Sequence, residues 1–138
     1  MTVSVEPVLE PISKTISILC GPILATAMAD AMDYCQTLGS VYSGFVDGQF
    51  VCCWGLIPPT FLSNQAYLWM WAPEPMKHQF VFIRQSQIQV RQMLERYEAV
   101  VGHCKINARS AQRWLKWLGA EFGQPSGDTI PFVIRRAA

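Results

Sequence analysis

The chain of 138 residues is the size of one ordinary domain, and its 11 Lys and Arg residues nearly balance its 10 Asp and Glu residues, for a formal net charge of +1. About half of the residues (51%) are hydrophobic, which is typical of a globular protein with one buried core. The balance of charge argues against a nucleic-acid partner, because binding to phosphates requires a clear excess of cations. No uninterrupted apolar stretch reaches the roughly 20 residues of a membrane span.

Cysteine usage predicts reduced thiols rather than a disulfide framework. The count of five is odd, and no two cysteines have the CxxC spacing of common metal-binding motifs. Cys52 and Cys53 are adjacent in a strand-like run, so their side chains would point to opposite faces and could not bind one metal ion together. We therefore expect no metal site.

The first 22 residues are hard to assign because prolines interrupt them. The alternation of β-branched residues in "TVSVEPV" fits a short first strand, so residues 1–22 are expected to form either this strand or an N-terminal arm. Residues 16–29 resemble the apolar part of an export signal, but Glu6 and Glu10 precede them where a basic start is required. We expect an intracellular, reducing location.

Local signals then predict a helix and a hairpin. Pro22 suits the first turn of a helix, and Gly39 suits its end. Asp47-Gly48 lies between two apolar runs and favours a two-residue hairpin turn. The expected elements are a helix at residues 23–38 and strands at residues 41–46 and 49–57.

A third strand and a long helix follow. "QAYLWMWAP" alternates aromatic and aliphatic side chains, and its Trp69 and Trp71 are expected to pack in the core or else to line a groove. From Lys77 to Glu98 apolar residues recur at spacings of three, four or seven, which is helical periodicity. The expected elements are a strand at residues 66–72 and a helix at residues 77–98.

The C-terminal third predicts a strand, a short helix and a final strand. "AVVGHCKI" is typical of a buried strand, Asn107 suits a helix cap, and Gly119 suits the end of that helix. These elements are expected at residues 99–106, 107–118 and 129–136. Because a strand that returns through a helix usually pairs in parallel, we predict an α/β fold with a mixed, largely antiparallel central sheet flanked by helices.

This order, with Asn107, a bulky aromatic residue and Leu118-Gly119, resembles the second half of the GNAT (N-acetyltransferase) fold. The resemblance covers residues 23–138 and implies a single GNAT-like domain there. It also implies acetyl-CoA as cofactor, with its pyrophosphate held by backbone amides at the start of the long helix.

Two departures from the family argue against acetyl transfer. The family's loop into the long helix carries glycines, which let bare amides approach the pyrophosphate, whereas "APEPMKHQFVF" (72–82) contains none. Pro73 and Pro75 lack the amide donor, and Glu74 adds a negative charge. The family often has a tyrosine in the last helix that protonates the leaving thiolate, but the nearest residue here is Trp114. We therefore expect a degenerate active site and no cofactor, and whether the protein is an enzyme stays open, with the two departures against it.

A narrower likeness suggests a structural role. "RWLKWLGAEF" and the helix ending "MLERYE" are similar to small GNAT-like internal virion proteins of short-tailed phages. This resemblance implies a bacteriophage protein of virion structure or assembly, located in the virion or host cytoplasm. Its partners would be phage structural proteins or further copies of itself, which would make a homo-oligomer possible. Nucleic acid is not an expected partner. The expected interaction surface comprises Trp114, Trp117, Arg113 and Lys116.

The alternative is an acetyl-CoA-dependent N-acetyltransferase with a divergent pyrophosphate loop, and a third hypothesis is an inhibitor that binds a host protein through the Trp-bearing helix. If acetyl-CoA binds, the expected contacts are Trp71, Ala72, Met76, Lys77, His78, Gln79 and Asn107.

Four residues have side chains that could act in catalysis. Glu74 and His78 are candidates for a general base, against ordinary roles as a solvated loop charge and a surface histidine. His103 and Cys104 are neighbours on a strand and point to opposite faces, so they cannot form a Cys-His nucleophile pair. We expect His103 to be structural.

Overall fold

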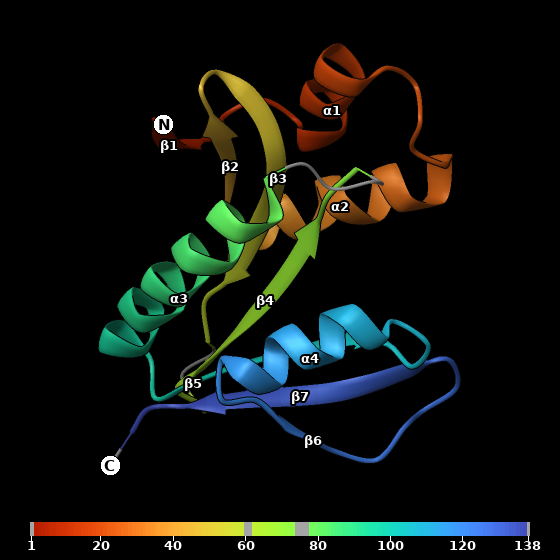
Figure 1. Ribbon diagram of the computed structural model, residues 1–138. Coiled ribbons are helices and arrows are strands. Elements are labelled where there is room, and N and C mark those ends of the chain that lie inside the picture. Colours follow the sequence, from red (N-terminus) through yellow and green to blue (C-terminus); the bar gives the residue numbers. More distant parts are fainter. Residues whose placement is uncertain (1, 60–61, 74–77, 138) are drawn as a thin grey trace. The chain divides into compact units, whose positions relative to one another are not determined.

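The computed structural model describes residues 2–59, 62–73 and 78–137 (Figure 1). Its strands form a seven-stranded sheet in the order β1-β2-β3-β4-β5-β7-β6. β4 and β5 are parallel, whereas the β1–β2, β2–β3, β5–β7 and β6–β7 pairs are antiparallel, so the predicted mixed sheet is confirmed. The elements are β1 (Val3–Pro7), α1 (Ile12–Cys20), α2 (Thr26–Leu38), β2 (Ser40–Val46), β3 (Gln49–Ile57), β4 (Gln65–Trp71), α3 (Gln79–Arg96), β5 (Ala99–Lys105), α4 (Arg109–Trp117), β6 (Glu121–Phe122) and β7 (Thr129–Arg135).

The chain divides into two compact units. One comprises the residues up to Pro58 together with Met70–Gln79, and the other comprises Pro59–Trp69 and the residues from Phe80 onward. In the described part of the chain, no helix combines the length and apolar character needed to cross a bilayer.

The predicted hairpin is confirmed in the first unit. Asp47 and Gly48 have φ values of 50° and 79°, and this pair of positive values is the turn geometry that matches the twist of antiparallel strands. Val46 and Gln49 form the first pair of the ladder. The adjacent thiols of Cys52 and Cys53 are both buried in β3, and burial raises the pKa of each to about 12.

The N-terminal segment departs from the expectation in one respect. β1 lies in the stretch with alternating β-branched residues, but α1 was not expected. Ile12 and Ile16, one helical turn apart, are fully buried. The first backbone N–H groups of α1, which have no partner within the helix, bind side chains of α2. Ile12 N–H donates to Gln36 Oε1 (2.8 Å), and Ser13 N–H donates to Asp33 Oδ1 (2.9 Å).

The start of α2 was predicted too early. The helix begins at Thr26, with Ala25 as its N-cap residue, so Pro22 lies in the preceding turn rather than in the helix. The reason is α1, because the chain needs a turn between the two helices, in which Gly21 adopts φ 86° and its carbonyl accepts a bond from Ile23 N–H (2.8 Å).

The core of the second unit lies under α3 and α4. A hydrophobic cluster joins one side chain from each helix to two from β7, and half-buried residues of β5, α3 and α4 pack against it. Its buried members are Val90, Leu115, Ala120, Phe132 and Ile134. The predicted long helix and the two predicted C-terminal strands are confirmed with small shifts of their ends, and the short edge strand β6 was missed.

The predicted end of α4 is confirmed, whereas its predicted N-cap is wrong. Gly119 ends the helix with φ 98°, and the bonds from Gly119 N–H to the Lys116 carbonyl and from Ala120 N–H to the Leu115 carbonyl form a Schellman motif. Asn107 is not the cap: Ala108 holds the N-cap position without a side-chain bond, and Gln112 instead donates to the carbonyl groups that precede the helix.

Candidate functional site

The candidate site lies where β4 and β5 separate, within the second unit. Their parallel ladder consists of only three pairs, Gln65↔Ala99, Ala66↔Val100 and Tyr67↔Val101. Both strands continue beyond the last pair, β4 to Trp71 and β5 to Lys105. β5 stays paired with β7 along its whole length. The early end of the ladder therefore leaves a strand edge that is not used by the neighbouring strand of the sheet.

Gly102 occupies the point at which the two strands diverge. A Cβ atom at this position would lie 2.6 Å from the carbonyl oxygen of Leu68 and 2.6 Å from Cζ of Phe132. Real Cβ atoms do not approach other heavy atoms this closely, so only glycine fits between the β4 backbone and the buried ring. This close approach fixes the position of the divergence.

Three polar groups share one face of the sheet beside the divergence. Tyr67 Oη and His103 Nδ1 are 3.0 Å apart, and their rings are tilted at 39° with centroids 5.8 Å apart. Because side chains alternate along strands, Trp69 lies on the same face as Tyr67, two residues beyond the last pair of the ladder. Trp69 is half-buried, and its Nε1 is buried with no hydrogen-bond partner among the described residues. A buried donor of this kind is uncommon in folded proteins.

The opposite face of β5 is structural. Cys104 packs against the hydrophobic cluster under α3 and α4, whereas His103 is exposed, so the prediction that they cannot act as a pair is confirmed. Burial raises the pKa of the Cys104 thiol. Trp114 also belongs to this side: its Nε1 donates to Ser86 Oγ (2.9 Å), and Ser86 Oγ donates to the Ile83 carbonyl (2.7 Å).

At the start of α3 one residue has an unusual backbone. His78 directly precedes the helix with φ 58°, a left-handed conformation that costs energy in any residue with a Cβ atom. Its Nε2 lies 3.4 Å from Gln49 Oε1. The first turn of α3 contains no acidic residue, and Gln79, its first residue, is exposed. Thus a left-handed histidine is found in the loop where the family's glycines were expected.

The remaining predicted site residues come from several segments of the chain. Trp71 ends β4, half-buried with its ring 6.4 Å from that of Phe50, and Ala72 follows it. Asn107 lies exposed in the turn before α4. Glu74, Met76 and Lys77 lie outside the described residues.

The predicted interaction surface separates into two parts. Trp114 is half-buried and 5.2 Å from Phe82, centroid to centroid, so it packs inside the unit. Trp117 is 53% exposed, and Arg113 and Lys116 are also exposed on α4. Only the last three lie at the surface as expected.

The grouping of Tyr67, Trp69 and His103 on one face was not predicted from the sequence. Alternation within each strand placed each residue on a face, but the pairing of β4 with β5 could not be deduced from the pattern within either strand alone.

Solved N-acetyltransferases share this fold. An acetyltransferase of Bacillus subtilis in complex with CoA matches with a TM-score of 0.75 and 8% identity over 97% of this chain and 99% of that one. The N-acetyltransferase PseH of Campylobacter jejuni matches with a TM-score of 0.69 and 8% identity over 98% of this chain and 99% of that one. A spermidine N-acetyltransferase SpeG chimera from Vibrio cholerae and hSSAT matches with a TM-score of 0.73 and 7% identity over 99% of this chain and 96% of that one. No protein-family model and no curated protein matches the sequence.

These matches correct one expectation and favour one hypothesis. The expectation that the chain uses no cofactor is overturned, because a protein of the same fold was solved in complex with CoA. The neighbours favour the acetyltransferase alternative over the virion role, and nothing in them indicates a phage origin. At these identities they establish a fold: the chain has a GNAT-type mixed α/β architecture, as the sequence predicted.

Proposed function

We propose that the protein is an acetyl-CoA-dependent N-acetyltransferase whose reacting centre lies beside the divergence of β4 and β5. The observation that carries the proposal is the three-pair ladder, because an unpaired strand edge can form strand-like hydrogen bonds with the amides of a long, thin thioester cofactor. The neighbours support it, since one of them was solved with CoA and two are described as N-acetyltransferases.

Features of the described residues fit such a cofactor. β4 continues beyond Tyr67, its last residue paired with β5, and alternate residues of that segment turn their backbone groups to the edge that β5 leaves. The orphan Nε1 of Trp69 is a donor that a carbonyl oxygen would satisfy. The start of α3, free of carboxylates in its first turn, favours an anionic group. When bound, acetyl-CoA would supply an activated acetyl group, so that a C–N bond to an acceptor amine forms as the C–S bond breaks, and CoA would leave as a thiolate that takes up a proton from water.

His103 is the proposed general base. With its proton on Nδ1, the imidazole donates to Tyr67 Oη across the 3.0 Å contact, which leaves the lone pair on Nε2. Nε2 then accepts the proton that the amine must lose. Tyr67 orients the imidazole ring and places a hydroxyl group beside the divergence. Trp114 in the last helix takes no part, because its indole N–H donates to Ser86. Glu74 and His78 stay predictions for this role.

Calorimetric titration of the whole chain with acetyl-CoA and with CoA tests the first step. We expect saturable binding at micromolar strength, and no binding up to about 1 mM would refute the proposal. Trp69→Phe keeps the aromatic ring and removes the Nε1 donor, so it should weaken acetyl-CoA binding about 2- to 10-fold.

Transfer of a labelled acetyl group to a panel of primary amines tests the second step. His103→Gln should lower the rate about 100-fold or more while leaving acetyl-CoA affinity unchanged. Lys105→Gln is the matched control, because Lys105 is exposed on the same face of β5, two residues further on. An equal effect of both substitutions would exclude His103 as the base.

A further inference from the structure

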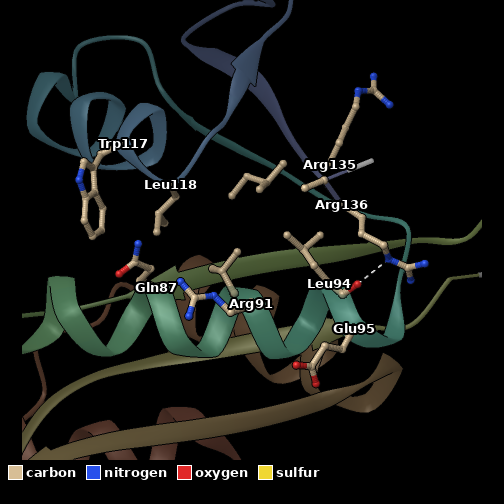
Figure 2. A pocket seen from close by; sticks show the side chains of 11 residues that line it. Gln87, Arg91, Leu94, Glu95, Trp117, Leu118, Arg135 and Arg136 are labelled. Carbon is tan, nitrogen blue, oxygen red and sulfur yellow. Dashed lines mark hydrogen bonds between the residues drawn. The ribbon is translucent and has the colours of Figure 1, made fainter.

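A groove remote in the sequence from β4 lies within the second unit, between α3, the end of α4 and the end of β7. It has a volume of about 580 Å³, which is in the range of ligand-binding pockets. Figure 2 shows Trp117 and Leu118 of the α4 end facing Gln87 and Arg91 of α3, with Leu94 and Arg136 towards the other end. None of the three residues of the candidate site lines it.

The floor of the groove is apolar. Val90 and Ile134 are buried members of the hydrophobic cluster, and Leu94 and Leu118 pack against them while also lining the groove. Trp117 stands at one end with half of its surface exposed. An apolar side chain inserted here would therefore contact an existing floor and a large aromatic ring, which is the arrangement of an interface hot spot.

The rim of the groove is cationic. Arg91, Arg135 and Arg136 are among its lining residues, with a single acidic residue, Glu95; in Figure 2 the side chains of Arg135 and Glu95 both point away from Trp117 and Leu118, which leaves Arg91 and Arg136 beside the floor. Arg136 Nε donates to the Leu94 carbonyl (2.7 Å), which holds that guanidinium in place. No ion pair involves these three arginines within the described residues. A chain with a net charge of only +1 thus concentrates unpaired cations around one apolar groove.

The two arginines that border the floor occupy different positions along the groove. Arg91 lies midway along the lining residues of α3, and Arg136 lies at Leu94, towards one end (Figure 2). The lining residues of α3 run from Gln87 to Glu95, which corresponds to about 12 Å of helix. That length accommodates about four residues of extended chain. A peptide with several carboxylates along this length could pair with both guanidinium groups.

We propose that this groove binds an acidic peptide segment of a protein partner, with an apolar or aromatic side chain on the floor and carboxylates on Arg91 and Arg136. Arginine and tryptophan are enriched at protein interfaces, and guanidinium groups pair with carboxylates through two parallel hydrogen bonds. This surface includes Trp117 but replaces the cations predicted beside it on α4 with those of α3 and β7.

Fluorescence anisotropy with a labelled peptide, Glu-Glu-Leu-Phe-Glu-Glu, tests the proposal on the whole chain. We expect saturable binding with a Kd below about 100 µM, weakened by added salt. The peptides Lys-Lys-Leu-Phe-Lys-Lys and Glu-Glu-Gly-Ser-Glu-Glu should bind at least about tenfold more weakly, since they lack the charge and the anchor, respectively.

The combined variant Arg91→Gln and Arg136→Gln should weaken binding about tenfold or more, as should Trp117→Ala. The matched control is Arg84→Gln, because Arg84 is exposed on α3 outside the groove. A control effect as large as that of the groove variants, or no saturable binding up to about 1 mM, would overturn the proposal. Tight binding of indole-3-acetate without binding of the acidic peptide would overturn it as well, in favour of a small aromatic anion.

Discussion

Gly102→Ala tests whether the separation of β4 from β5 depends on a single close approach. The added Cβ would lie 2.6 Å from Leu68 O and 2.6 and 2.8 Å from two ring carbons of Phe132. The oxygen belongs to the backbone of β4, and the ring is 6% exposed within the hydrophobic cluster. Neither neighbour can move aside by a simple rotation, so the strand and the ring must both shift.

The expected cost follows from these distances. An ordinary contact requires about 3.3 Å between Cβ and a carbonyl oxygen and about 3.5 Å between two carbon atoms, so the overlaps are about 0.7 Å with Leu68 O and about 0.9 Å with the Phe132 ring. Forced overpacking of this kind costs about 1 to 3 kcal/mol, and a clash on two sides belongs at the upper end. The smaller conformational entropy of unfolded alanine offsets about 0.5 kcal/mol. We expect a net loss of about 2 to 3 kcal/mol, or roughly 10 °C in Tm for a chain of this length.

Urea unfolding monitored by tryptophan fluorescence measures this change. Gly44→Ala is the matched control, because Gly44 also lies within a buried strand but its added Cβ would meet only the Trp54 and Cys52 side chains, at 3.3 Å and beyond. We expect the control to change stability by less than about 1 kcal/mol. If both variants unfold at the same urea concentration, the close approach at Gly102 does not hold the strands as described.

Two further predictions concern backbone strain and buried thiols. His78→Gly should be about 1 kcal/mol more stable than His78→Ala, because glycine adopts the left-handed φ of 58° without penalty; equal urea midpoints would show that this backbone is unstrained. Burial raises the pKa of Cys52 and Cys53 from 9.0 to about 12, so between these values the folded state holds protons that the unfolded state has lost. Their contribution is full below pH 9 and is lost as pH rises towards 12, at up to about 1.4 kcal/mol per pH unit and thiol. The decline in urea midpoint from pH 8 to 10.5 should be shallower in Cys53→Ala, and an unchanged slope would contradict the assigned burial.

Elements with local signals were predictable from the sequence. The Asp47-Gly48 turn needs only two residues with positive φ, and the stop at Gly119 needs only one. The apolar residues of α3 recur with helical spacing over 18 residues, so this pattern alone was enough to predict the helix. In each case the physical cause lies within a few neighbours along the chain.

Elements held by distant residues were not predictable. α1 begins after a proline without a capping side chain of its own, and its first donors bind Asp33 and Gln36 of α2, which are 20 and 24 residues away. β6 has two residues and exists because it pairs with β7. The candidate site has the same character, since Tyr67 and His103 are separated by 36 positions and meet through the register of β4 and β5.

The two faces of β5 allow stability and chemistry to be tested separately. Gly102 and Cys104 face the helices, where any change of volume alters a packed cluster. His103, between them, is exposed and contacts Tyr67 on the other face. A substitution at His103 should therefore shift the urea midpoint little while it removes the proposed base, whereas Gly102→Ala should unfold the protein more easily without removing any polar group of the site. If His103→Gln instead lowers stability as much as Gly102→Ala does, then His103 is a structural residue and the assignment of the reacting centre to this face is wrong.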